Sequence, residues 1–304
     1  GLRAWRGHPE PYGVRDWYIG NEVYYFGGKL AEDGAAAARA TRERVEAMRR
    51  VDPSLRTIVG FCAHRPAWTE AYLPQVADVA DRLSLHFYQT NEFDANYGKV
   101  TDRMRARVLE DAFLPELERA HRLAAELLPA PVPFSLDEWG YSWGERATAA
   151  SALVDALLLS CLCAQADAHH IEKALYFHPV NEGMIRVEPD GASLDMAGEV
   201  FRLFAPHREA SRLSAVSGDE ALCPAASRRG RQVFVTVVNR DVQAARTFRL
   251  EAEGCVAGEW EMTQLLPAAD GWRRETAAGA VGSEWMLAPG GVAAFAWKSH
   301  HPVA

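Results

Sequence analysis

Residues 15–22, with the sequence RDWYIGNE, decide the fold because a short apolar run ends there in an amide and a carboxylate. The aromatic and aliphatic side chains of this run are typical of a buried strand. Residues 133–139, PFSLDEW, repeat the pattern, with Asp137 and Glu138 closing the apolar part. Charged side chains at the end of a buried strand are costly unless they are paired or used. We therefore expect both strands to end at a polar rim.

The two runs belong to a longer alternation of short apolar segments and helical segments. Such an alternation predicts βα units and a parallel sheet. A Gly-rich phosphate turn would follow the first strand of an open doubly wound sheet, and the sequence has none there. The polar strand ends are instead typical of a (β/α)8 barrel. We expect strands at residues 15–20, 57–62, 83–88, 133–138 and 173–178, and helices near residues 34–51, 71–79, 101–128, 147–168 and 196–204.

Five strands are fewer than the eight that close such a barrel, and half a barrel leaves an unpaired edge. We therefore predict an α/β fold in which residues 1–207 form strands four to eight of a partial (β/α)8 TIM barrel. The chain would then be truncated at its N-terminus by about three βα units. From residue 208 onward, short strands alternate with Gly and Pro, which predicts an antiparallel β-sandwich domain over residues 208–304.

Composition excludes several partners. The formal net charge of the 304 residues is -8, which disfavours binding to nucleic acid. The longest apolar run, residues 147–168, contains Asp155 and Asp167 and predicts a buried helix rather than a membrane span. Five cysteines without a framework spacing favour a reduced, cytoplasmic location. We expect no membrane partner.

Two carboxyl groups facing each other across a sugar linkage are what hydrolysis with retention requires. One attacks the anomeric carbon and the other protonates the leaving oxygen, at a separation of about 5–5.5 Å. Glu22 and Glu138 fit this pair, because each follows a strand that ends at the barrel mouth. Asn21 would bind a sugar hydroxyl and Trp139 would form an apolar wall. The structural alternatives are a helix-capping Asn and an ion pair at the barrel end.

Residues 7–22, GHPEPYGVRDWYIGNE, resemble the fourth barrel strand of clan A retaining glycoside hydrolases. They are most similar to the α-L-arabinofuranosidases of glycoside hydrolase family 51. That family has a β-sandwich beside its barrel, an acid/base Glu after Asn on strand four and a nucleophilic Glu in an Asp-Glu-Trp setting on strand seven. Counting forward from strand four makes residues 133–138 strand seven. The resemblance implies that Glu22 is the acid/base and Glu138 the nucleophile.

The resemblance also implies roles on strand six. His86 would reach the sugar, and Tyr88 would donate a hydrogen bond to the nucleophile and so favour its ionised form. Core packing is the alternative for both.

The end of strand eight, residues 177–183 (FHPVNEG), departs from the commonest arabinofuranosidases. It offers His178 and Asn181 to the sugar pocket and Glu182 as a third carboxylate, ranked below Glu138. Trp143 would add a subsite platform or cover the barrel top.

We expect a retaining glycoside hydrolase that removes a terminal sugar, α-L-arabinofuranose, from plant-type polysaccharide or oligosaccharide by double displacement. A clan A β-xylosidase, β-glucuronidase or endo-glycanase is the alternative with the same mechanism. A non-catalytic carbohydrate-binding protein is the alternative of another class. The chemistry requires no cofactor and no metal. The resemblance implies a possible homo-oligomer.

Overall fold

The computed structural model describes residues 2–90, 100–142, 148–181, 183–252, 258–268 and 271–299. The chain forms two compact units. One comprises Gly1–His86, Glu116–Asp137 and His170–Leu175, and the other Phe87–Pro115, Glu138–His169 and Tyr176–Ala304. The domain boundary after residue 207 stays a prediction.

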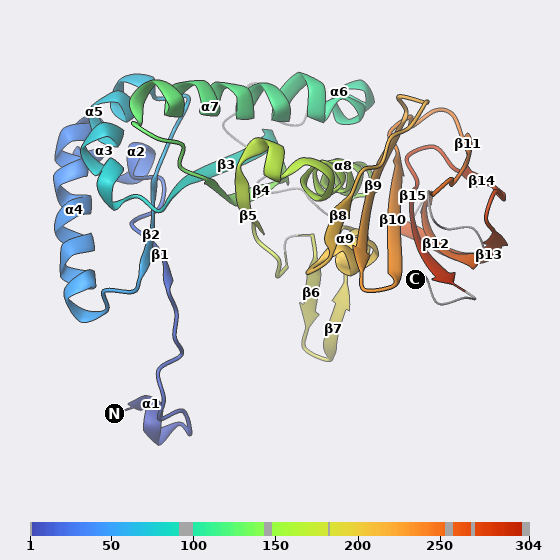
Figure 1. Ribbon diagram of the computed structural model, residues 1–304, viewed down its shortest axis with the longest axis horizontal. Coiled ribbons are helices and arrows are strands. Elements are labelled where there is room, and N and C mark those ends of the chain that lie inside the picture. The colour runs from blue at the N-terminus through green and yellow to red at the C-terminus, as the bar shows by residue number, and fades with distance from the viewer. Residues whose placement is uncertain are drawn as a thin grey trace. The chain divides into compact units, whose positions relative to one another are not determined.

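A parallel five-stranded sheet carries the barrel part of the fold (Figure 1). Its strands follow one another in the sheet as they do in the sequence, which is the arrangement that successive βα units produce. Trp17 pairs with Thr57, and Val59 pairs with Leu83. The predicted half-barrel is confirmed. The strands are β1 (Asp16–Tyr18), β2 (Arg56–Gly60), β3 (Arg82–Thr90), β4 (Phe134–Ser142) and β5 (Ile171–Tyr176).

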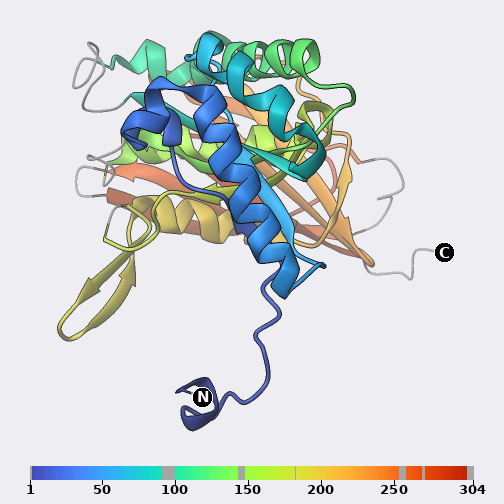
Figure 2. The same ribbon diagram turned by 90° about the vertical axis from the view of Figure 1, so that its left-hand side faces the viewer.

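Helix α4 (Gly34–Val51) lies in front of β1 and β2 in Figure 2 and packs on α5 (Pro66–Val76). Asp33 caps α4 by accepting a hydrogen bond from the Ala36 N–H at 2.9 Å. The helix can approach α5 closely because it begins with Gly34, where an added Cβ would lie 2.4 Å from the Trp68 carbonyl oxygen. It ends before Pro53, which disfavours a helical conformation at the preceding residue. The short helices α2 (Val23–Phe26) and α3 (Lys29–Glu32) precede α4, and α1 (Leu2–Trp5) begins the described chain.

The helix predicted for residues 101–128 is divided into three parts, which corrects the expectation of one continuous helix. Helix α6 (Asp102–Ala106) is followed by a wide π-helical turn over Leu109–Phe113 and then by α7 (Leu114–Leu127). The Leu114 N–H donates to the Leu109 carbonyl, five residues back. Pro115 has no N–H to donate, so the regular ladder cannot pass through this point.

Helix α8 (Ala149–Gln165) is buried on most of its surface, as its apolar sequence predicts. Thr148 and Ser151 form a capping box at its start. Within the described part of the chain, no helix is both long enough and apolar enough to cross a membrane. The hairpin of β6 (Ile185–Glu188) and β7 (Gly191–Leu194) and the amphipathic helix α9 (Met196–Phe204) follow β5.

The C-terminal part is antiparallel, which confirms the predicted β-sandwich fold. A six-stranded sheet has the order β13-β12-β15-β10-β9-β8, and β11 pairs separately with β14. Aromatic side chains form the core, with Phe295 edge-on to Phe248, Trp260 and Trp285. The strands are β8 (Ser211–Leu213), β9 (Leu222–Arg229), β10 (Gln232–Asn239), β11 (Arg246–Arg249), β12 (Gly258–Ala268), β13 (Gly271–Ala280), β14 (Glu284–Leu287) and β15 (Val292–Ser299).

The amino ends of the barrel strands carry a network of fixed charges. Asp16 binds Lys173, and it also binds Arg56 through an N–O distance of 2.7 Å. Arg82, whose side chain is 4% exposed, contacts Asp16 at 3.4 Å and binds Glu172. The hydrogen bond from Lys173 lowers the pKa of Asp16, and the bond from Arg82 lowers the pKa of Glu172. Cations therefore hold both carboxylates ionised.

Candidate active site

Glu22 lies just beyond the carboxyl end of β1. The Ile19 N–H donates to the Ile58 carbonyl at 2.9 Å, so the chain stays beside β2 up to this point. Glu22 then adopts a left-handed conformation with φ 42° and is the N-cap residue of α2. A non-glycine residue in this region carries a strain of about 1 kcal/mol or more, and such residues cluster at functional sites. At this point the chain leaves β1 and enters α2, so Glu22 lies at the carboxyl end of the strand.

The carboxylate of Glu22 is bound to a histidine from β3. His86 Nδ1 lies 2.7 Å from Glu22 Oε1, and the two side chains are 7% and 19% exposed. The other ring nitrogen of His86 lies 3.7 Å from Asp137 Oδ2 and 3.4 Å from Ser84 Oγ. Asp137 accepts hydrogen bonds from the Leu85 N–H at 3.1 Å and from Ser84 Oγ at 2.9 Å. These contacts form a continuous line from Asp137 through His86 to Glu22.

Glu138 follows Asp137 on β4 and has a different partner. The Tyr88 hydroxyl donates to Glu138 Oε2 at 2.9 Å. This hydrogen bond is the one that the resemblance implies for strand six. Because His86 and Tyr88 are two residues apart on one strand, their side chains project from the same face of the sheet.

A buried aspartate supports the end of β4. Asp155 on α8 is fully buried and accepts hydrogen bonds from the Tyr141 N–H at 3.0 Å and the Tyr176 hydroxyl at 2.9 Å. These two hydrogen bonds link β4, the strand that carries Glu138, to Tyr176, the last residue of β5. Asp155 stands out in the sequence as a charge within an apolar helix, but the sequence does not show that it contacts β4 and β5. Asp137 was likewise visible in the motif, without any sign that it contacts His86.

Trp139 is a core residue in this structure. Its side chain is 1% exposed, lies edge-on to Tyr176 and stacks on Phe201. This packing favours a structural role, and the predicted contact of Trp139 with a sugar stays a prediction.

The other predicted binding residues are placed in different ways. Asn21 is exposed beside Glu22, and His178 is half-buried beside the ring of Phe177. Asn181 has φ 60°, and its side-chain oxygen accepts a hydrogen bond from the Val187 N–H at 2.7 Å, which fixes the start of the β6–β7 hairpin. Trp143 and Glu182 lie outside the described residues.

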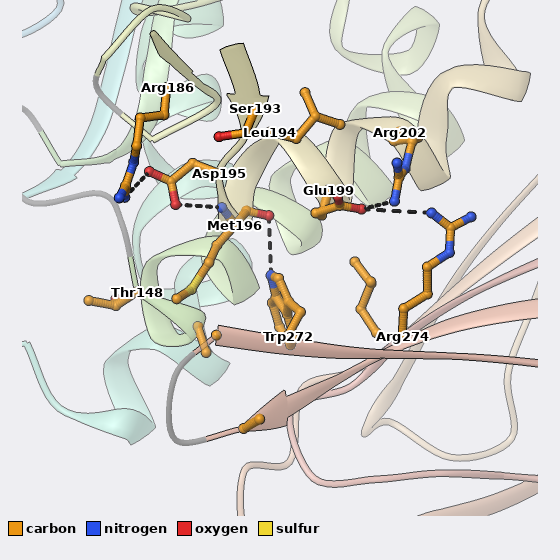
Figure 3. Close-up of a pocket in the computed structure, with 14 residues that line it drawn as sticks. Thr148, Arg186, Ser193, Leu194, Asp195, Met196, Glu199, Arg202, Trp272 and Arg274 are labelled. Carbon is orange, nitrogen blue, oxygen red and sulfur yellow. Dashed lines mark hydrogen bonds and ion pairs between the residues drawn. The ribbon is translucent and has the colours of Figure 1, made fainter. Parts of the chain in front are cut away.

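A cavity of about 720 Å³ lies among β7, α9 and the start of β13 (Figure 3). Its charged side chains are already paired: Arg186 binds Asp195 at 2.8 Å, and Glu199 binds Arg202. The Trp272 indole donates to the Met196 carbonyl at 3.2 Å. None of the predicted site residues that the structure describes lines this cavity, and its paired charges do not offer the two carboxyl groups that glycoside hydrolysis uses.

A parallel half-barrel with carboxylates at its strand ends and an antiparallel β-sandwich fold are what the resemblance to clan A glycoside hydrolases predicts. Comparisons with known proteins show which enzymes the chain is similar to. No protein-family model matches the chain. Two curated relatives are each named intracellular exo-α-(1→5)-L-arabinofuranosidase. The one from Streptomyces lividans is 26% identical over 164 residues, which cover 51% of this chain and 24% of that protein. The one from Halalkalibacterium halodurans is 34% identical over 107 residues, or 32% of this chain and 21% of that protein. The matches therefore span about a quarter or less of the relatives' length.

Solved structures agree on the fold. The family 51 α-L-arabinofuranosidase from Thermotoga petrophila superposes with a TM-score of 0.74 at 23% identity, covering 98% of this chain and 69% of that one. The family 51 arabinofuranosidase from Xanthomonas axonopodis pv. citri gives 0.74 at 19% identity, covering 96% and 68%. The resemblance to this family that the motifs predict is confirmed.

Proposed function

We propose that the protein is a retaining glycoside hydrolase that removes terminal α-L-arabinofuranosyl groups from oligosaccharides or polysaccharides of plant type. The observation that carries the proposal is the placement of Glu22 and Glu138 after two strands of one parallel sheet, each with a hydrogen-bonding partner on β3. The names of the curated relatives support the choice of sugar. Those relatives are named as intracellular, and a cytoplasmic location stays a prediction for this chain.

Glu138 is the nucleophile in this proposal. The Tyr88 hydroxyl donates a hydrogen bond to Glu138 Oε2 at 2.9 Å, which leaves the other carboxylate oxygen to attack the anomeric carbon. Attack forms a covalent glycosyl-enzyme and breaks the bond to the leaving oxygen. Water then attacks the same carbon, releases the sugar with its original anomeric configuration and returns Glu138 to the carboxylate.

Glu22 is the acid/base. It gives its proton to the leaving oxygen in the first step and takes one from water in the second. His86 Nδ1 lies 2.7 Å from Glu22 Oε1, and His86 Nε2 lies 3.7 Å from Asp137 Oδ2. In this assignment, His86 and Asp137 position the acid/base.

Hydrolysis of a panel of nitrophenyl glycosides by the purified protein tests the proposal, with proton NMR to identify the first-formed anomer. We expect hydrolysis of the α-L-arabinofuranoside with retention. Hydrolysis of a β-xyloside or β-glucuronide alone would keep the mechanism and replace the sugar. Inversion would overturn the roles of both carboxylates. Sugar binding without turnover of any substrate would favour the non-catalytic alternative.

A further inference from the structure

Helix α8 carries one charged side chain, and that side chain is fully buried. Asp155 is the single charged residue of Ala149–Gln165. Taking a carboxylate out of water is costly unless hydrogen bonds compensate. Asp155 Oδ1 accepts from the Tyr141 N–H at 3.0 Å, and Oδ2 accepts from the Tyr176 hydroxyl at 2.9 Å. One buried charge therefore joins α8 to the strand that carries Glu138 and to the last residue of β5.

The side chain of Tyr176 is fixed by close packing as well as by Asp155. Its ring lies edge-on to Trp139, with the ring centroids 5.2 Å apart, and edge-on to Phe201 at 5.0 Å. Gly140 leaves space for the ring, because a Cβ added there would lie 3.3 Å from Tyr176 Cε2 and 3.6 Å from Asp155 Oδ1. The packing of the ring and the hydrogen bond of the hydroxyl together restrict Tyr176 to a single position.

Phe177, the next residue in the chain, connects Tyr176 to the proposed nucleophile by two routes. Its N–H donates to the Trp139 carbonyl at 3.3 Å, which holds the backbone next to Glu138. Its ring lies edge-on to the Tyr88 ring, with centroids 6.4 Å apart, and the Tyr88 hydroxyl donates to Glu138 Oε2 at 2.9 Å. Both the backbone beside the nucleophile and the hydrogen bond to its carboxylate therefore depend on the end of β5.

We propose that Asp155 is a positioning residue that acts on Glu138 through the end of β5. The inference rests on the proposed function, in which Glu138 attacks the anomeric carbon. Attack requires a well-placed carboxylate, and a displacement of about 1 Å can cost about 10²-fold in rate. Asp155 and Glu138 belong to the same compact unit, and Glu22 belongs to the other. Loss of the hydrogen bond between Asp155 and Tyr176 should therefore slow the attack by Glu138 and leave proton transfer by Glu22 unchanged.

Tyr176→Phe tests the proposal with the least disturbance, because it removes the hydroxyl and keeps the ring. We expect kcat/KM to fall about tenfold, and by the same factor for an α-(1→5)-linked arabinotriose and for a dinitrophenyl arabinofuranoside, since Glu138 attacks both substrates. Tyr72→Phe is the matched control. The Tyr72 hydroxyl makes a buried hydrogen bond to Thr41 Oγ1 at 3.1 Å in the other compact unit, and its loss should change neither rate.

Asp155→Asn is the second variant. The Asn side chain keeps an acceptor for the Tyr141 N–H but presents an N–H group to the Tyr176 hydroxyl. We expect the same loss of kcat/KM for both substrates as in Tyr176→Phe. The double variant should lose little more than Asp155→Asn alone, because the two residues act through one hydrogen bond. If Asp155→Asn does not fold, Tyr176→Phe decides alone.

A further comparison separates positioning of the nucleophile from general support of the fold. In Glu138→Ala, added azide takes the place of the carboxylate, and azide is not attached to the chain. Tyr176→Phe in this background should leave the azide-dependent rate within about twofold, although it slows the reaction about tenfold when Glu138 is present. A residue that only stabilised the fold would slow both reactions equally.

Two results would overturn the proposal. An equal loss in the azide reaction would mean that Tyr176 supports the whole site, and normal kcat/KM in Tyr176→Phe would mean that Glu138 keeps its position without this hydroxyl. The unaltered protein distinguishes these results from failure of the proposed function. If it hydrolyses no arabinofuranoside, the proposed function fails first and the role of Asp155 fails with it.

Discussion

The two ends of the barrel strands use charge in opposite ways. At the amino ends, Asp16 and Glu172 are bound by Lys173, Arg56 and Arg82, whose charges do not change near neutral pH. At the carboxyl ends, Glu22 is bound by a histidine and Glu138 by a tyrosine hydroxyl. A histidine side chain can gain or lose a proton near neutral pH, and a tyrosine hydroxyl donates a single hydrogen bond. The amino end is therefore suited to stability, and the carboxyl end to proton transfer.

This difference leads to opposite expectations for substitutions at the two ends. Changes at the carboxyl ends should alter rates while leaving stability nearly unchanged. Changes at the amino ends should alter stability while leaving the chemistry nearly unchanged. A site whose carboxylates were only structural would not show this separation.

The largest effect is expected for Glu138→Ala. Loss of the nucleophile should lower kcat by about 10⁴-fold or more, because no other group forms the covalent intermediate. The measurement is steady-state hydrolysis of a nitrophenyl arabinofuranoside. Glu118→Ala, which removes an exposed carboxylate from α7, should keep the normal rate. A rate within tenfold of normal for Glu138→Ala would remove this residue from the mechanism.

Glu22→Ala should depend on the leaving group. We expect kcat/KM to fall about 10³-fold for an oligosaccharide, whose leaving oxygen needs a proton, and much less for a dinitrophenyl glycoside. The test is the dependence of kcat/KM on the pKa of the leaving group, measured across a series of aryl glycosides. An equal loss for every leaving group would show that Glu22 does not act as the acid.

At the amino end, Arg82→Ala should lower the free energy of unfolding by about 2 kcal/mol, because it removes the buried cation that binds Glu172 and one of the three cations that contact Asp16. Urea unfolding measures the change. Arg42→Ala, which breaks an exposed pair with Asp78, is the control and should cost much less. If Arg82→Ala changed the hydrolysis rate and left the free energy of unfolding unchanged, the assignment of stability to the amino ends and of chemistry to the carboxyl ends would be wrong.

His207 is a histidine whose two ring nitrogens bind hydroxyl groups, in contrast to His86, which binds a carboxylate. It is buried between Ser227 Oγ, at 2.8 Å from Nδ1, and Thr236 Oγ1, at 3.2 Å from Nε2. Burial lowers the pKa of His207 to about 4. Between about pH 6.5 and pH 4 the unfolded chain binds a proton that the folded chain does not, so stability should fall as the pH falls through this range.

Thermal unfolding at several pH values tests the role of His207. In His207→Gln, about 2–3 kcal/mol of the pH dependence between pH 4 and 6.5 should disappear. If the free energy of unfolding had the same pH dependence in the variant and in the unaltered protein, groups other than His207 would cause the loss of stability in acid.

The smallest effect is expected for Asp137→Asn, which keeps the shape of the side chain and removes its charge beside His86. We expect kcat/KM to fall about tenfold for the oligosaccharide and to change little for an activated leaving group, because Asp137 acts only through the acid/base. Ser84→Ala should act in the same direction and more weakly. A loss that is equal for both substrates would indicate a structural role.

Much of the fold could be predicted because each element has a strong local signal. Residues 34–51 and 196–204 form helices with the expected bounds, since caps and prolines end them. The positions of β9 and β13 could not be predicted, because small and charged residues dilute their alternation. The wide turn before Pro115 was missed because it depends on one absent N–H within an otherwise regular helical pattern.

The site could be predicted only in part. Glu22 and Glu138 are visible in sequence because each closes an apolar strand. The contact between His86 and Glu22 joins residues 64 apart and depends on the neighbouring positions of β1, β2 and β3.

The most direct test of the account is the anomeric configuration of the glycosyl azides formed when azide is added to the Glu138→Ala and Glu22→Ala variants with an activated arabinofuranoside. In Glu138→Ala, azide takes the place of the nucleophile and should give a product of inverted configuration. In Glu22→Ala, azide attacks the covalent intermediate on Glu138 and should give a product that retains the substrate's configuration. Opposite configurations from the two variants are the predicted result. The same configuration from both, or no azide product from either, would contradict the assigned roles.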